Sequence, residues 1–433
     1  MAITGRAVLL AFAGVAAVLI AGGAGPWVLW GMTGLLAALL ALDLLLAASA
    51  RQVRFEREGD TSVRLGESAT VGLLVRNGSR RHLRARIRDA WPPSAEAHPA
   101  SSTVTIPRGG TRRLQTTLTP VRRGDQRAAR VTVRSVGPLG LAARQCTHTV
   151  PWTVRALPPF HSRRHLPGKI SRLRQLEGRN LAMVRGQGSE FDSLREYVPG
   201  DDVRSIDWRA TARRESVVVR TWRPERDRRI LVVLDTSRTS AGRVGDTPRL
   251  DHSMDAALLL ATLAARAGDR VDMLAFDRQV RARVRSSGRG SAVSAMVQAM
   301  APLEAALVES EPAGLISEIM GRHSRTRQLV VLLTDLNAAA MEEGLLPRLS
   351  TLTSRHLVLV AAVSDPRVSE MAQRRGSAPA VYEAAAAERT RSERRRVTAE
   401  LRRRGVEVVD AGPEAIALAL ADAYISLKAA GRL

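Results

Sequence analysis

The residues best suited to chemistry lie just after two apolar runs in the second half of the chain. Asp235 ends the first run, and Ser237 and Thr239 follow it at alternate positions. Asp335 closes the second run. The carboxyl ends of parallel strands meet at one edge of a sheet, where open α/β sheets bind ligands, so these side chains are expected to converge. Carboxylate and hydroxyl oxygens suit Mg²⁺, which accepts few protein ligands and keeps several waters.

The same residues also have a purely structural interpretation, because an Asp or Ser at a strand–helix junction commonly caps the following helix. The sequence offers few residues for enzymatic chemistry. The chain has no G-x-x-x-x-G-K-[ST] phosphate loop, no H-E-x-x-H and no G-x-S-x-G motif. Its one cysteine, Cys146, excludes an internal disulfide and a cysteine-based zinc site. We therefore expect no enzyme, and a hydrolase in which a metal at Asp235 activates water is the alternative.

The two apolar runs belong to a region in which strand and helix patterns alternate. Strands are expected at 229–237, 270–276, 328–336, 356–365 and 406–411, and helices at 251–267, 291–302, 341–354, 382–404 and 414–428. Strands that are apolar throughout are typical of a parallel sheet covered on both faces. Residues 229–433 are therefore predicted to form a doubly wound α/β domain.

The N-terminal region predicts a membrane anchor. The apolar residues divide into segments at 5–22 and 27–49, separated by the turn-forming residues Gly22 to Pro26. A span needs about 20 residues, so residues 5–50 are predicted to form a transmembrane helical hairpin. A cleaved signal peptide is the alternative, but two long segments exceed one signal-peptide core. Asp43, inside the second segment, is expected near the membrane interface.

The distribution of arginine predicts the orientation of this anchor. Arg6 precedes the hairpin, and Arg51, Arg54 and Arg57 follow it. Positive residues flank membrane helices on the cytoplasmic side, so both ends are expected inside. The predicted protein is a two-pass protein of the inner, cytoplasmic membrane with its soluble part in the cytoplasm.

Between the anchor and the α/β domain, two further regions are expected. Residues 52–157 contain short runs that alternate apolar and polar residues, with turns such as Asn77-Gly78 and Gly109-Gly110 between them. This pattern predicts a small β-sandwich, immunoglobulin-like in broad architecture. Residues 158–228 are predicted to form a basic linker that ends in an unusually charged segment.

That charged segment, at 188–214, mixes opposite charges with aromatic residues around a tight turn at Pro199-Gly200. The residues of interest are Glu190, Asp192, Arg195, Tyr197, Asp201, Asp202, Arg204, Asp207 and Trp208. Alternating charges can simply form a solvated face. Aromatic residues are only 3% of the chain, and their presence favours a buried ion-pair cluster that docks on the α/β domain.

The segment G-x-E-F-D-x-L-R-E-Y-x-P-G-D-D-x-R-x-I-D-W-x-A-T-A-R resembles the signature of the bacterial "domain of unknown function 58" family. Further matches are P-x-R-R-G from Pro120, G-P-L-G-L from Gly137 and Y-x-x-L-K from Tyr424. The residues around Asp235 resemble the metal-ion-dependent adhesion site of von Willebrand factor A domains, whose motif is D-x-S-x-S. Thr239 takes the third position, with Ser240 as the alternative. The candidate for that family's loop threonine is Ser291.

The formal net charge of +24 is compatible with two kinds of partner, nucleic acid and an anionic membrane surface. With a predicted anchor, the membrane is the expected one, and a nucleic-acid-binding protein is an alternative. The family resemblance implies association with MoxR-type AAA+ ATPases. The predicted function is therefore that of a membrane-anchored factor for protein interaction or assembly, with an Mg²⁺ site of the adhesion type.

Overall fold

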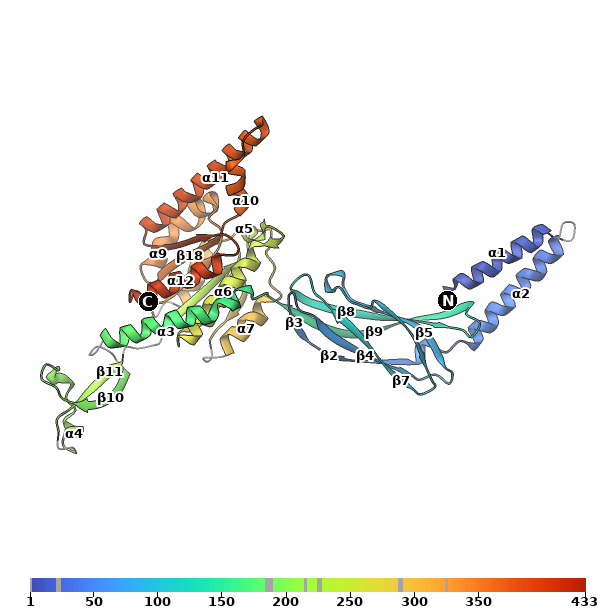
Figure 1. Cartoon of the computed structure of the whole chain (residues 1–433), viewed down its shortest axis with the longest axis horizontal. Helices are drawn as coiled ribbons and strands as arrows, with labels where there is room; N and C mark the ends of the chain where they lie inside the picture. Colours follow the sequence, from blue (N-terminus) through green and yellow to red (C-terminus); the bar gives the residue numbers. More distant parts are fainter. Residues whose placement is uncertain are drawn as a thin grey trace. The chain divides into compact units, whose positions relative to one another are not determined.

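The computed structural model describes residues 2–20, 25–183, 190–213, 216–223, 228–286, 291–323 and 326–433. The chain forms two compact units, Met1–Leu157 and Pro158–Leu433, and each is described by itself (Figure 1).

Unit 1 begins with two apolar helices, α1 (Gly5–Ile20) and α2 (Gly25–Leu46), which pack side by side (Figure 1). The stretch Pro26–Gln52 has a mean hydropathy of 2.0 and, by length and composition, could cross a membrane. Helix α1 has 16 residues, fewer than the about 20 that a span usually needs. The described residues thus contain one spanning candidate and one shorter apolar helix, where two spanning segments were expected.

Both ends of this helix pair meet the same β-sandwich. Ahead of α1, β1 (Ala2–Ile3) pairs antiparallel with β9 (Ala142–Leu157). The hydroxyl of Thr4 donates to the carbonyl oxygens of Gly140 and Leu141, at 2.6 and 3.0 Å. After α2, a short connection with one 3-10 turn, η2 (Ala50–Gln52), leads into β2 (Val53–Gly59), the first long strand of the sandwich. The beginning and the end of the helix pair therefore lie on one side of it.

Asp43 joins α2 to the same turn of the sandwich. Its side chain is fully buried, and its two oxygens accept backbone N–H groups of Leu139, Leu141 and Ala142 at 2.8, 2.7 and 2.8 Å. A Cβ atom at Gly137 would overlap this carboxylate. The G-P-L-G-L motif is therefore the turn that receives Asp43, a role that the sequence alone did not reveal.

The sandwich has a six-stranded sheet, in the order β1-β9-β8-β5-β6 with β3 beside β9, and a three-stranded sheet, β2-β4-β7. The strands not yet bounded are β3 (Ser62–Arg64), β4 (Ala69–Asn77), β5 (Leu83–Ala90), β6 (Ser101–Ile106), β7 (Thr111–Leu118) and β8 (Gly124–Val136). Strict alternation is clearest in β5, where Leu83, Ala85 and Ile87 are buried and the arginines between them are exposed. This period of two gives each strand one core face.

Unit 2 is built on a six-stranded sheet in the order β16-β15-β12-β17-β18-β19. The strands are β12 (Arg229–Asp235), β15 (Arg270–Phe276), β16 (Val280–Val284), β17 (Leu329–Leu333), β18 (Leu357–Val363) and β19 (Glu407–Ala411). All pair in parallel except the edge strand β16, which runs antiparallel to β15. The chain builds outward from β12 to one side and then from β17 to the other, so the sheet reverses its order between these two strands.

Helices cover both faces of this sheet (Figure 1). They are α3 (Leu166–Met183), α5 (Arg238–Ala241), α6 (Arg249–Arg266), α7 (Ser291–Met300), α8 (Pro312–His323), π-helix η6 (Ala340–Leu345), α9 (Leu349–Thr353), α10 (Pro366–Gln373), α11 (Ala378–Arg403) and α12 (Ile416–Ala429). Leu231, Val233, Val330 and Leu332 share one core with α8, η6, α9 and α11. Helices α6 and α12 pack on the other face. Helix α3, from the expected linker, packs on α6 and α12, and Lys169 pairs with Asp422 at 2.6 Å.

The charged signature segment forms a β-hairpin, here called the signature arm (residues 190–223). Its strands β10 (Glu190–Glu196) and β11 (Val218–Arg223) are antiparallel, and its tip holds a short turn, η5 (Val203–Ser205), and α4 (Trp208–Thr211). The described ion pairs of the arm are internal: Arg195 with Asp201 at 2.5 Å, and Arg220 with Asp207 at 2.8 Å. The partners of Asp201 and Asp207 are thus arginines of the arm itself, and docking of the arm on the α/β domain stays a prediction.

Candidate functional site

The reversal of strand order places two loop starts side by side at the carboxyl edge of the sheet. Leu234 of β12 pairs with Leu333 of β17, so the next residues, Asp235 and Thr334, become neighbours. In open α/β sheets this crevice, outside the ends of strands that lead to opposite sides, is where ligands bind. The fold thus brings a carboxylate and a hydroxyl together from positions 99 residues apart.

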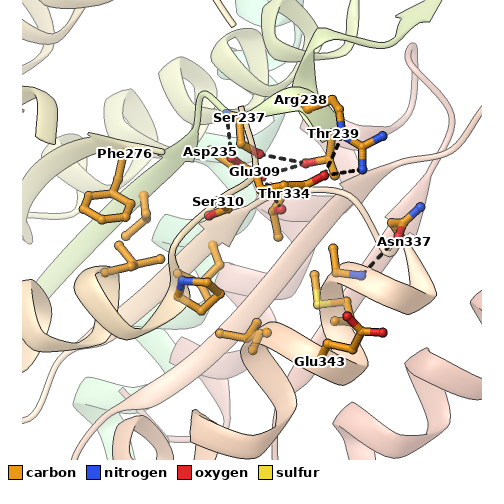
Figure 2. Close-up of a pocket in the computed structure, with 18 of the residues that line it drawn as sticks. Asp235, Ser237, Arg238, Thr239, Phe276, Glu309, Ser310, Thr334, Asn337 and Glu343 are labelled. Carbon is orange, nitrogen blue, oxygen red and sulfur yellow. Dashed lines mark hydrogen bonds and ion pairs between the residues drawn. The ribbon is translucent and has the colours of Figure 1, made fainter. Parts of the chain in front are cut away.

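Asp235 is the centre of a cluster of oxygen atoms (Figure 2). It is 9% exposed, and its Oδ2 accepts the hydroxyls of Thr239 and Thr334 at 2.9 and 2.6 Å. Its Oδ1 accepts the backbone N–H of Ser237 at 2.8 Å. The hydroxyl of Ser237 lies 3.2 Å from that of Thr239. One carboxylate and three hydroxyl groups therefore converge at the expected edge.

The capping interpretation accounts for only part of this arrangement. Ser237 is the N-terminal flanking residue of α5, but its side chain makes no capping hydrogen bond to that helix. The alternative residue Ser240 is 2% exposed, and its backbone N–H donates to the carbonyl of Ser237. Asp235, Ser237 and Thr239 come together as the motif requires. The side chain of Ser291, the candidate for the loop threonine, lies outside the described residues.

Asp335 has different partners from those expected. Its Oδ1 accepts from Arg394 at 2.7 Å, and its Oδ2 lies 3.2 Å from a guanidinium nitrogen of Arg249. Arg394 also pairs with both oxygens of Asp410, at 2.8 Å each. Burial would lower the pKa of Arg394, but its ion pairs with Asp410 and Asp335 raise it, so this guanidinium stays charged. Asp335 therefore belongs to an ion-pair network that anchors α11, and the structure gives the Asp235 cluster no second carboxylate from it.

Arg249 connects this network to the cluster without neutralising Asp235. Its guanidinium donates to the backbone carbonyl of Thr239 at 2.9 Å, which fixes the loop that carries the hydroxyls. Among the described residues, no lysine, arginine or histidine forms an ion pair with Asp235. A nearly buried carboxylate without a cation is costly unless some other group compensates it.

The donor set agrees with a hard cation of weak affinity. Within the described residues, no three His, Cys, Asp or Glu side chains gather as a metal cluster. A metal at this place would rely on the carboxylate of Asp235 and the neutral oxygens of Ser237, Thr239 and Thr334. Mg²⁺ accepts such a set because it keeps several waters and uses only one or two protein carboxylates.

The cluster lines one part of a cavity of about 350 Å³ (Figure 2). The apolar part of the lining comes from the strand ends, α8 and η6, and includes Phe276, Leu315, Leu332 and Met341. Glu309, Glu343 and Arg238 also line it, and Arg238 pairs with Glu309 at 2.7 Å. The volume lies within the range of pockets that hold a small ligand or one large side chain.

None of the described signature residues is among those that line this cavity, and all belong to the signature arm. Arg195, Asp201, Asp207 and Trp208 are placed as described above. Asp202 accepts the backbone N–H of Arg204 at 3.0 Å, and the backbone N–H of Tyr197 donates to Val217 at 2.8 Å. The side chains of Glu190 and Asp192 lie outside the described residues.

Two residues of the site were missed from the sequence. Thr334, immediately before Asp335, supplies the hydroxyl that donates to Asp235. Its position at the end of the apolar run could have indicated this role. Arg249 begins α6, and no spacing rule in the sequence ties it to a loop ten residues earlier.

Comparison with known families assigns this part of the chain. Residues 193–407 match the model described as "Protein of unknown function DUF58". The chain carries a DUF58 domain. Uncharacterized proteins of Mycobacterium bovis and Mycobacterium tuberculosis are 28% identical to it over 202 residues, which is 45% of this chain. The match spans 61% of the length of these curated relatives.

Solved structures similar to parts of the chain include two that each cover nearly half of it. The VWA domain of SpRpn10 is 9% identical and covers 45% of this chain and 94% of its own, with a TM-score of 0.27. An aerotolerance-related membrane protein from Bacteroides fragilis is 14% identical and covers 46% and 98%, with a TM-score of 0.29. The CARDB domain of the PF1109 protein from Pyrococcus furiosus is 14% identical and covers 26% and 94%, with a TM-score of 0.20.

Proposed function

We propose that this protein is a membrane-anchored factor for protein interaction, and that the pocket beside Asp235 is its contact site. One observation carries the proposal: a nearly buried carboxylate without a described cationic partner lines a largely apolar cavity, at the point where the sheet reverses its order. The site offers hard oxygens and an apolar floor, and its surroundings show no paired acid and base for turnover among the described residues.

In this proposal Mg²⁺ completes the contact. Asp235, Ser237, Thr239 and Thr334 would hold the ion, and the bound ion would offer its remaining coordination positions to a carboxylate of the partner. The engagement of Asp335 with Arg249 and Arg394 leaves a single protein carboxylate, so the affinity for the free ion should be low. A partner carboxylate would then raise that affinity, because binding of the ion and binding of the partner are thermodynamically linked.

The family resemblance suggests a MoxR-type AAA+ ATPase as the partner, and the membrane as the place of action. The helix pair supports the second point. Its two ends meet one β-sandwich, through β1 at the start and Asp43 near the end. An anchor that returns the chain to its starting side would keep the sandwich and the DUF58 domain in the cytoplasm, where such an ATPase finds ATP.

The test uses the full chain purified in detergent. Titration calorimetry should detect Mg²⁺ or Mn²⁺ binding that Asp235→Ala abolishes. Capture of the purified MoxR-type ATPase from the same bacterium should weaken with chelator and with this variant. Asp365→Ala is the matched control, because Asp365 also follows a strand of the sheet and caps a helix, through the N–H of Arg367 at 3.0 Å. No metal uptake, together with capture that is indifferent to chelator, would reduce the cluster to a structural role.

A further inference from the structure

The tip of the signature arm exposes apolar side chains that a folded protein usually buries. Trp208 is 69% exposed, Val203 63% and Val198 56%. The tip is nevertheless well built: Asp207 caps α4 by accepting the N–H groups of Arg209 and Ala210 at 3.0 Å each. Its internal ion pairs hold the tip in shape before any partner arrives. A preformed tip with an exposed tryptophan has the character of an interface anchor.

The charge of the arm indicates what kind of partner it fits. Residues 190–223 contain seven acidic and seven basic residues, although the whole chain has a formal net charge of +24. A neutral arm is poorly suited to nucleic acid or to an anionic membrane, both of which select a basic surface. Its described carboxylates mostly serve internal contacts, whereas Arg204, Arg209 and Arg213 are exposed and have no described ion pair. The complementary surface is therefore a protein pocket with an apolar floor and acidic residues at its rim.

The cavity beside Asp235 has this composition. Its apolar lining includes Phe276, Leu315 and Met341, and its volume of about 350 Å³ lies near the lower end of the range of ligand pockets, a size that suits a group as large as one aromatic side chain. At its rim, Glu343 is exposed and has no described ion pair, and Glu309 is held by a single arginine. One chain thus carries both an aromatic tip flanked by arginines and an apolar pocket flanked by carboxylates.

The two features stand before and after strand β12 in the chain. The arm precedes the amino end of β12, whereas the pocket lies at the carboxyl end of the same strand. These two ends of β12 are seven strand residues apart, about 23 Å at 3.3 Å per residue. An arm of one copy that occupies the pocket of a neighbour therefore makes a contact between two different surfaces, which is head-to-tail.

We infer that the signature arm of one copy inserts Trp208 into the pocket beside Asp235 of a second copy. The inference rests on the pocket of the proposed function and names its occupant. Arg204, Arg209 and Arg213 then face the rim carboxylates of the neighbour. Such a contact is heterologous, so each copy offers one arm and one pocket, and repeated contacts close into a ring or extend as a row. A shared membrane anchor favours this arrangement, because it gives all copies the same orientation.

The test is a mixing experiment with two differently tagged populations of the full chain in detergent. Trp208→Ala should weaken self-association, measured by analytical ultracentrifugation, by at least about 30-fold, the effect of an interface hot spot. Glu343→Lys should weaken it in the same direction. Mixed together, these two variants should form a pair, since one retains an intact pocket and the other an intact arm. A symmetric interface would not be rescued in this way.

Matched controls come from elsewhere on the same domain. Tyr382→Ala removes another aromatic side chain, 78% exposed on α11, and Glu370→Lys reverses another exposed carboxylate, on α10. Both should associate as the natural chain does. A monomer at all concentrations, or association that neither arm nor pocket variants change, overturns the inference. Binding of the natural chain to single-stranded DNA or to anionic vesicles also overturns the inference if Trp208→Ala abolishes that binding. The proposed function is tested separately, because Mg²⁺ uptake by the natural chain and its loss in Asp235→Ala do not depend on self-association.

Discussion

At the scale of single residues, four buried carboxylates are compensated in different ways. Asp335 accepts from two arginines, Asp269 pairs with Lys428, and Asp43 accepts three backbone N–H groups. Asp235 has only one backbone N–H and two hydroxyls. Neutral hydroxyls stabilise a carboxylate less than a cation does. This difference, rather than the D-x-S-x-T pattern, is what distinguishes Asp235 as a binding residue.

Lys428 offers a test of how much a buried ion pair contributes. Its ammonium group lies 3.2 Å from both oxygens of Asp269, and the hydroxyl of Tyr424 donates to Asp269 at 2.5 Å. These residues explain the Y-x-x-L-K motif, because they fasten α12 to the start of β15. Removing one partner of a buried pair costs about 3–5 kcal/mol. Lys428→Ala should lower the free energy of unfolding by that order, measured by denaturant titration, whereas Lys169→Ala at the half-exposed Asp422 pair should cost far less.

The loss in Lys428→Ala should depend on pH. Burial raises the pKa of Asp269, and the charge of Lys428 opposes that rise. Without the lysine, the pKa of Asp269 in the folded state should rise further. A carboxyl group with a raised folded-state pKa favours folding at pH values below its unfolded pKa, and this contribution is lost as the pH rises through the folded value. The variant should therefore be closest to the natural chain at acidic pH and weakest at neutral pH. An equal loss of unfolding free energy at acidic and at neutral pH would contradict the ion pair of Lys428 with Asp269.

At the scale of elements, the regular part of the fold could be predicted from periodicity. The runs expected at 270–276, 328–336 and 406–411 correspond to β15, β17 and β19, because strands buried on both faces are apolar throughout. The edge strand β16 was missed. Its residues Val280 to Val284 include two arginines, since one side of an edge strand faces water. The ion-pair partners in the signature arm could not be predicted, because a charged sequence does not show whether its ion pairs form within a hairpin or across an interface.

Only the residues of the candidate site that lie close together in the chain could be predicted from the sequence. Asp235, Ser237 and Thr239 are close in the chain, so alternate positions after a strand were enough to bring them together. The partner of Asp335 was beyond prediction, because Arg394 lies 59 residues away on a helix with many arginines. Thr334 and Asp335 are adjacent in the chain but follow the end of β17, where strand periodicity no longer applies, so their different partners, Asp235 and Arg394, could not be predicted from their spacing.

The junction between α2 and the sandwich gives an element-scale prediction. Asp43→Ala would leave three backbone N–H groups of the 137–142 turn without their acceptor, and a buried unsatisfied donor costs about 1–3 kcal/mol. Gly137→Ala should act in the same direction, because its Cβ overlaps the Asp43 carboxylate. Both variants should unfold at lower temperature in detergent, measured by intrinsic fluorescence. Asp60→Ala is the control, since this exposed carboxylate accepts a single N–H, from Thr70 at 2.8 Å; an equal loss there would remove the special role of Asp43.

At the scale of the whole molecule, the sandwich lies in the chain between the apolar helix pair and the DUF58 domain. The N-terminal segment contributes an edge strand, β1, and a buried carboxylate, Asp43, to that sandwich. A helix pair held at both ends to one folded domain should resist changes of its own topology. This constraint adds to the arginines at its flanks, which favour the cytoplasmic side on electrostatic grounds.

These constraints predict that Ala2 and Leu433 lie on the same, cytoplasmic side. A single span through α2 alone would place Ala2 outside and break the pairing of Ala2 with Ala143 and of Ile3 with Ala142. Single cysteines can be placed at Ala2, Gly25 and Leu433 in a Cys146→Ser background. In intact cells, an impermeable maleimide should label only the cysteine at Gly25, the first residue of α2. The other two should react only after the membrane is permeabilised. Labelling of Ala2→Cys in intact cells, with Leu433→Cys protected, would establish one span, and the contact between β1 and β9 would then have to form without the membrane.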